Sequence, residues 1–115
     1  MIFVIDDDEI MAECVAKACS KKDVEIFDNA ISAMDKISGG HLPDLIFMDV
    51  MLSGPDGFTF LNEMISYADT QKIPVVIVSE IDFSDKNLSE YGVVGTLVKE
   101  RMVPEEIKEY AERYC

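Results

Sequence analysis

Five short apolar runs, separated by segments of helical periodicity, constrain the fold of this chain more than any other feature. The runs are IFVI (2–5), VEIF (24–27), LIFM (45–48), VVIV (75–78) and TLV (96–98). Most of them are continuous rather than alternating with polar residues, which is typical of strands buried on both faces of a parallel sheet. We therefore predict five parallel strands.

Helical periodicity predicts helices in the intervals between these runs. Apolar residues share one face in segments 30–37, 58–68 and 107–114, and the last segment follows Pro104, a residue that suits the first turn of a helix. Segment 9–19 is apolar nearly all round, which predicts a well-buried first helix. Three of these segments lie between predicted strands, and the fourth follows the last strand.

The segment SDKNLSEY (84–91) has the weakest helical pattern. Only Leu88 and Tyr91 are available there for burial. We expect a short helix that is the most mobile element of the fold, because few apolar contacts hold it.

Strict alternation of strands and helices predicts a doubly wound α/β fold. With five strands, the expected architecture is a parallel sheet of flavodoxin-like order 2-1-3-4-5, with helices on both faces. A length of 115 residues suits one compact core. Residues 1–115 are therefore expected to form a single domain.

Composition excludes several classes of partner and location. The formal net charge of −13 repels nucleic-acid phosphates and anionic membranes. No apolar run reaches the roughly 18 residues of a membrane span, and the first residues, MIFVI, do not have the pattern of a secretory signal. Three cysteines without CxxC spacing are predicted to be reduced thiols, and the cytoplasm is the expected location.

Polar side chains follow the predicted strands at the edge where such sheets bind ligands. Asp6, Asp7 and Asp8 follow the first strand, Asp49 the third, Ser79 the fourth and Lys99 the fifth. In doubly wound sheets, ligands bind beyond the carboxyl ends of the strands, at the point where the strand order reverses. The sequence therefore predicts that these side chains converge.

Their chemistry is complementary. Gathered carboxylates repel one another by about 4 kcal/mol per pair at an effective dielectric near 20, and one lysine does not balance three of them. A divalent cation with hard oxygen ligands does, and Mg²⁺ is the natural candidate. Asp49, at the exposed end of a strand, is then a candidate nucleophile toward phosphorus, with Lys99 and Ser79 binding the phosphoryl oxygens.

Simpler structural roles account for other polar residues nearby. Asp8 is predicted to be a helix N-cap, and Asp56 with Gly57 is interpreted as a turn with the glycine at positive φ. His41 is expected to be exposed, and the methionines are expected to fill the core.

Four motifs in this order resemble the receiver domains of two-component response regulators, over the whole chain. FVIDDDE resembles the acidic motif of the first strand, and DLIFMDVMLSGPDG resembles the phospho-acceptor strand with its turn. IPVVIVS resembles the strand that carries a hydroxyl, and GTLVK the strand that carries a lysine.

The resemblance implies that Asp49 is phosphorylated by a histidine kinase, a phosphotransfer protein or a small phosphodonor. It implies that Mg²⁺ is held by Asp7, Asp49 and the main-chain carbonyl of Met51, with Asp6 acting through water. Ser79 and Lys99 take the places of the switch hydroxyl and the lysine.

Such a domain is a regulatory switch rather than a conventional enzyme, since it catalyses only its own phosphorylation and dephosphorylation. Phosphorylation is then expected to shift the face formed by residues 84–99. A downstream protein, an output domain or a second copy, in a homodimer formed on phosphorylation, would read that face.

Several positions depart from the receiver pattern. Thr96 stands where receivers usually have an aromatic switch residue, Glu100 replaces the proline that commonly follows the lysine, and Glu80 replaces a small residue after the hydroxyl. Ser53 also replaces the usual proline. We expect an output that does not use rotation of an aromatic ring, and access to Asp49 that Glu80 slows.

Two alternative functions remain open at this point. FVIDDDEI also fits the start of haloacid-dehalogenase-like phosphatases, with Asp6 as nucleophile and Asp8 as acid, although the threonine that should follow is replaced by Ile10. A pseudo-receiver, a binding module that keeps the fold but takes no phosphoryl group, is the second alternative.

Overall fold

The fold is taken from a computed structural model, which describes residues 1–19, 22–51 and 57–115. Its elements in chain order are β1 (Ile2–Ile5), α1 (Glu9–Ala18), β2 (Val24–Phe27), α2 (Ala30–Ser38), β3 (Leu45–Met48), α3 (Gly57–Ile65), β4 (Val75–Ser79), the 3-10 turn η1 (Ser89–Tyr91), β5 (Val93–Val98) and α4 (Pro104–Tyr114).

The five strands form one parallel sheet of order β2-β1-β3-β4-β5, which confirms the predicted architecture. The register pairs Ile5 of β1 with Phe27 of β2 and with Met48 of β3. All residues of β1, β3 and β4 are buried, as expected for continuous apolar runs that are covered on both faces.

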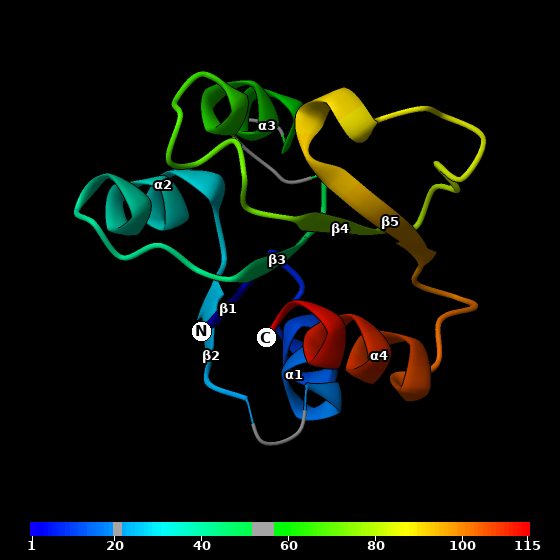
Figure 1. The fold of residues 1–115 in the computed structure, drawn as a ribbon. Coiled ribbons are helices and arrows are strands. Elements are labelled where there is room, and N and C mark those ends of the chain that lie inside the picture. The colour runs from blue at the N-terminus through cyan, green and yellow to red at the C-terminus, as the bar shows by residue number, and fades with distance from the viewer. Residues whose placement is uncertain (20–21, 52–56) are drawn as a thin grey trace.

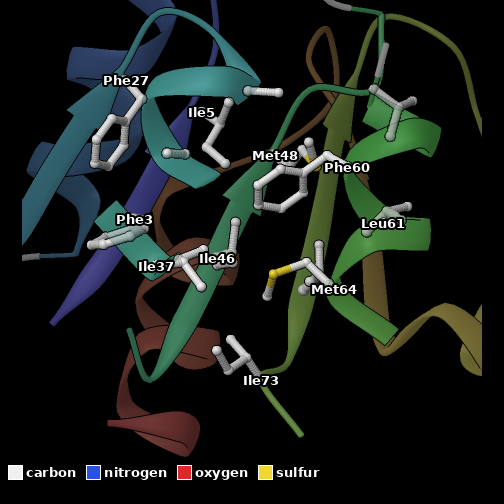
Figure 2. Packing of buried hydrophobic residues seen from close by; sticks show 14 of the residues in the cluster. Phe3, Ile5, Phe27, Ile37, Ile46, Met48, Phe60, Leu61, Met64 and Ile73 are labelled. Carbon is white, nitrogen blue, oxygen red and sulfur yellow. The ribbon is translucent and has the colours of Figure 1, made fainter. Parts of the chain in front are cut away.

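Two layers of helices cover the sheet (Figure 1). Helices α1 and α4 pack side by side on one face, over Val4, Phe47 and Val76, and α2 and α3 cover the other. Figure 2 shows Phe60 and Met64 of α3 beside Ile46 and Met48 of β3, within the core cluster on the face that α2 and α3 cover. The topology therefore leaves the ends of the strands, rather than their faces, available for a site.

Helix α1 is less buried than its sequence predicts, so that expectation was wrong. Ala12 and Val15 are buried, but Ile10 is 77% exposed and Cys14 is also exposed. A helix lying on a sheet buries only one stripe, and the apolar residues outside that stripe remain in water. Asp8 caps this helix as predicted, since its carboxylate accepts a hydrogen bond of 3.1 Å from the N–H of Met11.

The predicted helix over 84–91 is also wrong, because only the 3-10 turn Ser89–Tyr91 forms there. Side chains compete for the backbone: Asp82 accepts a hydrogen bond from the N–H of Ser84 at 2.8 Å, and Asn87 accepts one from the N–H of Ser89 at 3.3 Å. Such local bonds favour turns over helix. Leu88 and Tyr91 nevertheless pack against the core.

Three smaller expectations have mixed outcomes. Helix α3 ends at Ile65, so the exposed Ala68 is not part of it, whereas His41 is exposed as expected. Met48 and Met64 fill the core, but Met51 is 56% exposed. Among the described residues, no helix has both the length and the apolar character that a bilayer crossing requires.

Candidate functional site

Parallel pairing of β1 with β3 brings their terminal aspartates together. Asp6 follows Ile5 and Asp49 follows Met48, and these two preceding residues are register partners. Asp6 is 4% exposed and Asp49 is 6% exposed, whereas Asp7 is exposed. One carboxylate oxygen from each of Asp6, Asp7 and Asp49 lies within 4.8 Å of the others.

Lys99 brings a cation into this cluster from the end of β5. Its Nζ lies 2.9 Å from Oδ2 of Asp49 and 3.0 Å from Oδ2 of Asp6. The ammonium side chain is itself only 7% exposed. A backbone hydrogen bond of 2.9 Å from the N–H of Lys99 to the carbonyl of Ser79 fixes the end of β5 against β4.

Backbone donors hold the two buried carboxylates in place. Oδ1 of Asp6 accepts a hydrogen bond of 2.9 Å from the N–H of Asp8, and Oδ1 of Asp49 accepts one of 2.8 Å from the N–H of Met51. Each carboxylate therefore uses one oxygen for the backbone and the other for Lys99. Because both oxygens of each carboxylate have a partner, the orientation of both side chains is fixed.

Burial is the largest single influence on the pKa values of Asp6 and Lys99. It raises the pKa of Asp6 above the usual value, and this outweighs the opposing effects of the Asp8 N–H and Lys99. Burial also lowers the pKa of Lys99, but hydrogen bonds to Asp49 and Asp6 more than offset that, so its pKa is raised overall. The lysine therefore remains a cation at neutral pH.

Ser79, at the end of β4, is fully buried. Its hydroxyl oxygen accepts a hydrogen bond of 3.3 Å from the N–H of Ile81, at the start of the loop that leads to η1. The hydroxyl is thus linked to the backbone of residues 80–92, which connect β4 to β5.

Met51 lies two residues after Asp49 and is tied to it through its N–H. Glu80 and Glu100 are both exposed, directly after Ser79 and Lys99, and Thr96 is half-buried on β5. Glu80 and Glu100 therefore stand beside two residues of the predicted site in the sequence, but neither is buried. Ser53 and Asp56 lie outside the described residues.

Gly57 has a role that the sequence interpretation missed. It is the first residue of α3, and φ is positive only at Gly40 and Gly92 among the described glycines, so the predicted positive φ was wrong. A Cβ at Gly57 would instead lie 2.4 Å from Cα of Val50, the residue after Asp49. Gly57 is therefore required because α3 begins so close to the Val50 backbone, and an apolar pattern does not reveal that distance.

The donor set of the cluster suits a hard divalent cation. It offers one oxygen from each of three carboxylates, all within 4.8 Å of one another, and the ammonium of Lys99 contacts two of these carboxylates. Carboxylate oxygens are the ligands that Mg²⁺ and Mn²⁺ prefer. The buried ammonium of Lys99, beside oxygens of both Asp6 and Asp49, is a group that could bind a phosphoryl oxygen.

Comparison with known proteins identifies similar sequences. A family model described as "Response regulator receiver domain" matches residues 2–112. Response regulator PleD of Caulobacter vibrioides is 31% identical over 86 residues, which are 70% of this chain but only 18% of PleD. The chain therefore spans less than a fifth of that curated relative.

Solved structures show the same fold. The receiver domain of NtrX from Brucella abortus superimposes with a TM-score of 0.83 at 26% identity, covering 99% of this chain and 97% of that domain. The Mn²⁺-bound form of response regulator Rcp1 has a TM-score of 0.75 at 20% identity, covering 97% and 88%. The second likeness concerns the fold alone.

Proposed function

Because this chain belongs to the response regulator receiver domain family, we propose that it is a phospho-accepting signalling switch whose acceptor is Asp49. The observation that carries the proposal is the contact of Lys99 Nζ with Oδ2 of Asp49 at 2.9 Å, beside the acidic cluster. A buried ammonium on a buried carboxylate at the ligand-binding edge of the sheet supports phosphoryl transfer better than a purely structural role.

In the proposed reaction, a carboxylate oxygen of Asp49 attacks the phosphorus of a phosphohistidine or of a small acyl phosphate. The new O–P bond forms as the P–N or P–O bond to the donor breaks, and the donor group leaves with the bonding electrons. A leaving imidazole takes up a proton, whereas a leaving carboxylate departs as the anion. Phosphoryl transfer depends mainly on positioning and charge neutralisation. The Met51 N–H positions Asp49, and Lys99 supplies positive charge.

A divalent cation, proposed to be Mg²⁺, fits the gathered carboxylate oxygens of the cluster. Asp7, Asp49 and the main-chain carbonyl of Met51 would hold it, and Asp6 would act through water. When bound, it would neutralise charge on the phosphoryl oxygens. The fold of the Mn²⁺-bound Rcp1 is shared with this chain, which supports the choice of a divalent ion.

The signal would travel from Ser79 into the following loop. Its hydroxyl accepts from the N–H of Ile81, and it would turn to donate to a phosphoryl oxygen on Asp49. Residues 80–92 would then move toward the site, which shifts the balance between two arrangements of the face formed by residues 84–99. Thr96 lies in this face, so the output would not use an aromatic ring there.

The proposed partners follow from this chemistry. A histidine kinase or phosphotransfer protein would donate the phosphoryl group in the cytoplasm, and a downstream protein, an output domain or a second copy would read the shifted face. Direct contact with nucleic acid is not expected of a domain with a net charge of −13. The exposed Glu80 would slow access of water or donor to Asp49.

The test is incubation with acetyl phosphate and Mg²⁺, followed by mass spectrometry of the intact protein. We expect a single phosphoryl adduct on the wild type and on Asp85→Asn, an exposed control, and none on Asp49→Asn. An adduct that persists in Asp49→Asn would contradict the assignment. If the wild type binds the metal but takes no adduct, the result would favour a pseudo-receiver. In a separate assay with a phosphate ester, steady turnover that is lost only in Asp6→Asn would favour a phosphatase.

A further inference from the structure

A groove separate from the acidic cluster lies between the first two turns of α2 and those of α3. These two helices lie on the same face of the sheet, opposite α1 and α4 (Figure 1). The groove has a cavity of about 230 Å³, with the apolar side chains of Ile31, Met34 and Phe60 among those that line it. Apolar surface dominates its lining.

The apolar surface of this groove is not fully used by the core. Phe60 is 3% exposed and Met34 packs partly against the core, but Ile31 is 55% exposed. Ile31 is adjacent in sequence to the buried Ala30, yet it points away from the sheet-facing stripe of α2. Binding of a partner that covers an exposed apolar residue beside a cavity is favourable, because apolar surface is removed from water.

Two carboxylates border the groove, one on each helix. Asp35 of α2 and Glu63 of α3 are exposed and line the same cavity. Within residues 1–19, 22–51 and 57–115, neither has a cationic side chain at ion-pair distance. Lys36, the cation next to Asp35, pairs instead with Glu25 at 3.7 Å.

We infer that this groove docks a cationic amphipathic helix of a partner protein. One or two aliphatic side chains of that helix would enter the cavity beside Ile31, and flanking Lys or Arg residues would reach Asp35 and Glu63. A helix suits a groove between two helices, because residues three and four positions apart present an apolar anchor and its basic flanks on one side. The inference does not depend on phosphorylation of Asp49.

Charge and size exclude the other occupants. A second copy that docked through the same groove would bring the same acidic border, so Asp35 and Glu63 of the two copies would repel one another. Anionic lipid surfaces and nucleic acids are excluded for the same reason. The volume is also below the roughly 300 Å³ at which pockets for small organic ligands begin.

The probe is a designed amphipathic peptide of about 14 residues, with a leucine stripe flanked by lysines. A peptide in which glutamates replace the lysines serves as its control. Binding to the unphosphorylated chain is followed by amide chemical shifts and by titration at low and raised salt. We expect the lysine peptide to bind and to shift amides around Ile31, Met34 and Phe60, and the glutamate peptide not to bind.

Variants distinguish binding of the peptide at this groove from binding that depends only on the net charge of the chain. The double variant Asp35→Asn/Glu63→Gln is expected to bind the lysine peptide at least about fivefold more weakly, as two exposed ion pairs are lost. The double variant Glu105→Gln/Glu109→Gln removes the same charge from α4, on the other face of the sheet, and is expected to bind like the wild type. Ile31→Ala should also weaken binding while leaving the charge unchanged.

Three outcomes would overturn the inference. The first is an equal loss of affinity in both double variants, which would mean that the peptide follows total charge. The second is a set of amide shifts that lies away from α2 and α3. The third is a concentration-dependent dimer that Ile31→Ala abolishes, because the groove would then be an interface between copies of this chain.

Discussion

The ammonium of Lys99 donates a hydrogen bond of 2.9 Å to Oδ2 of Asp49, which lies 50 residues earlier in the chain. The same ammonium lies 3.0 Å from Oδ2 of Asp6, and all three side chains are almost completely buried. One lysine therefore pairs with two carboxylates, and its charge opposes the rise that burial causes in the pKa of Asp6. We expect the stability of the fold to depend on this contact.

Replacement of Lys99 by alanine should lower the free energy of unfolding by about 3 kcal/mol at pH 7, because two buried carboxylates lose their partner. Since burial already raises the pKa of Asp6, its ionisation at neutral pH costs stability in the folded state. That cost disappears below the ordinary aspartate pKa of about 4. The deficit of the variant should therefore shrink as the pH falls, which urea denaturation in a chelator will measure.

The exposed Lys86 supplies the control for this substitution. Lys86→Ala removes the same charge and should leave the free energy of unfolding within about 0.5 kcal/mol of the wild type. A divalent cation should restore part of the stability of Lys99→Ala, since it replaces the missing positive charge. Equal stability of Lys99→Ala and Lys86→Ala would mean that the buried ion pair contributes nothing.

The strands and the composition of the site were predictable because both depend on local patterns. Continuous apolar runs indicate buried parallel strands, and parallel pairing of β1 with β3 then forces Asp6 and Asp49 together. Lys99 follows from the same reasoning at the end of β5. Predicting the cluster required only the order of the strands and the identity of the residue after each.

The misses have their physical origin in interactions that an apolar pattern does not show. The segment 84–91 has a helical pattern, but hydrogen bonds from nearby N–H groups to the side chains of Asp82 and Asn87 favour turns. The exposure of Ile10 depends on which stripe of α1 faces the sheet. A single sequence shows that α1 is apolar, but not how it is rotated.

Gly57 should not tolerate alanine, because the added Cβ would lie 2.4 Å from the Val50 backbone. Helix α3 must then move away from the segment that follows Asp49, at a cost of about 2 kcal/mol or more. Gly39→Ala is the matched control, since its Cβ would find its nearest atom at 3.4 Å. Thermal unfolding of both variants tests this, and equal melting temperatures would refute the steric explanation.

Cys19 should make stability fall at alkaline pH. Burial raises the pKa of its thiol from 9.0 to about 11. As the pH rises, the thiol therefore ionises in the unfolded chain before it ionises in the folded one. The contribution of the protonated thiol to the free energy of unfolding is complete below pH 9 and is lost between about pH 9 and 11. Two pKa units correspond to about 2–3 kcal/mol.

Comparison of pH profiles isolates this effect from the titration of lysines and tyrosines. Between pH 8.5 and 11, the wild type should lose about 2 kcal/mol more than Cys19→Ala. The exposed Cys14 provides the control, and Cys14→Ala should follow the wild type. Parallel profiles for the wild type and Cys19→Ala would show that the buried thiol does not retain its proton.

Gly95 and Tyr110 should show strong coupling, because the tyrosine occupies the space of the missing Cβ. A Cβ at Gly95 would lie 1.9 Å from the hydroxyl oxygen and 2.5 Å from Cζ of Tyr110. Gly95→Ala must therefore displace a ring that also makes an edge contact with Phe47, at 6.5 Å between centroids. We expect Gly95→Ala to cost about 2 kcal/mol of unfolding free energy.

A double-mutant cycle can separate this clash from the general cost of alanine in an edge strand. Tyr110→Leu shortens the side chain, so the methyl group that Gly95→Ala adds then fits. The free energy of unfolding of the double variant should therefore be about 1 kcal/mol higher than the sum of the two single changes predicts. Tyr114→Leu, on the same helix and against the same core, should be additive with Gly95→Ala. Additivity in both cycles would mean that Tyr110 yields without cost, and that Gly95 serves the strand rather than the tyrosine.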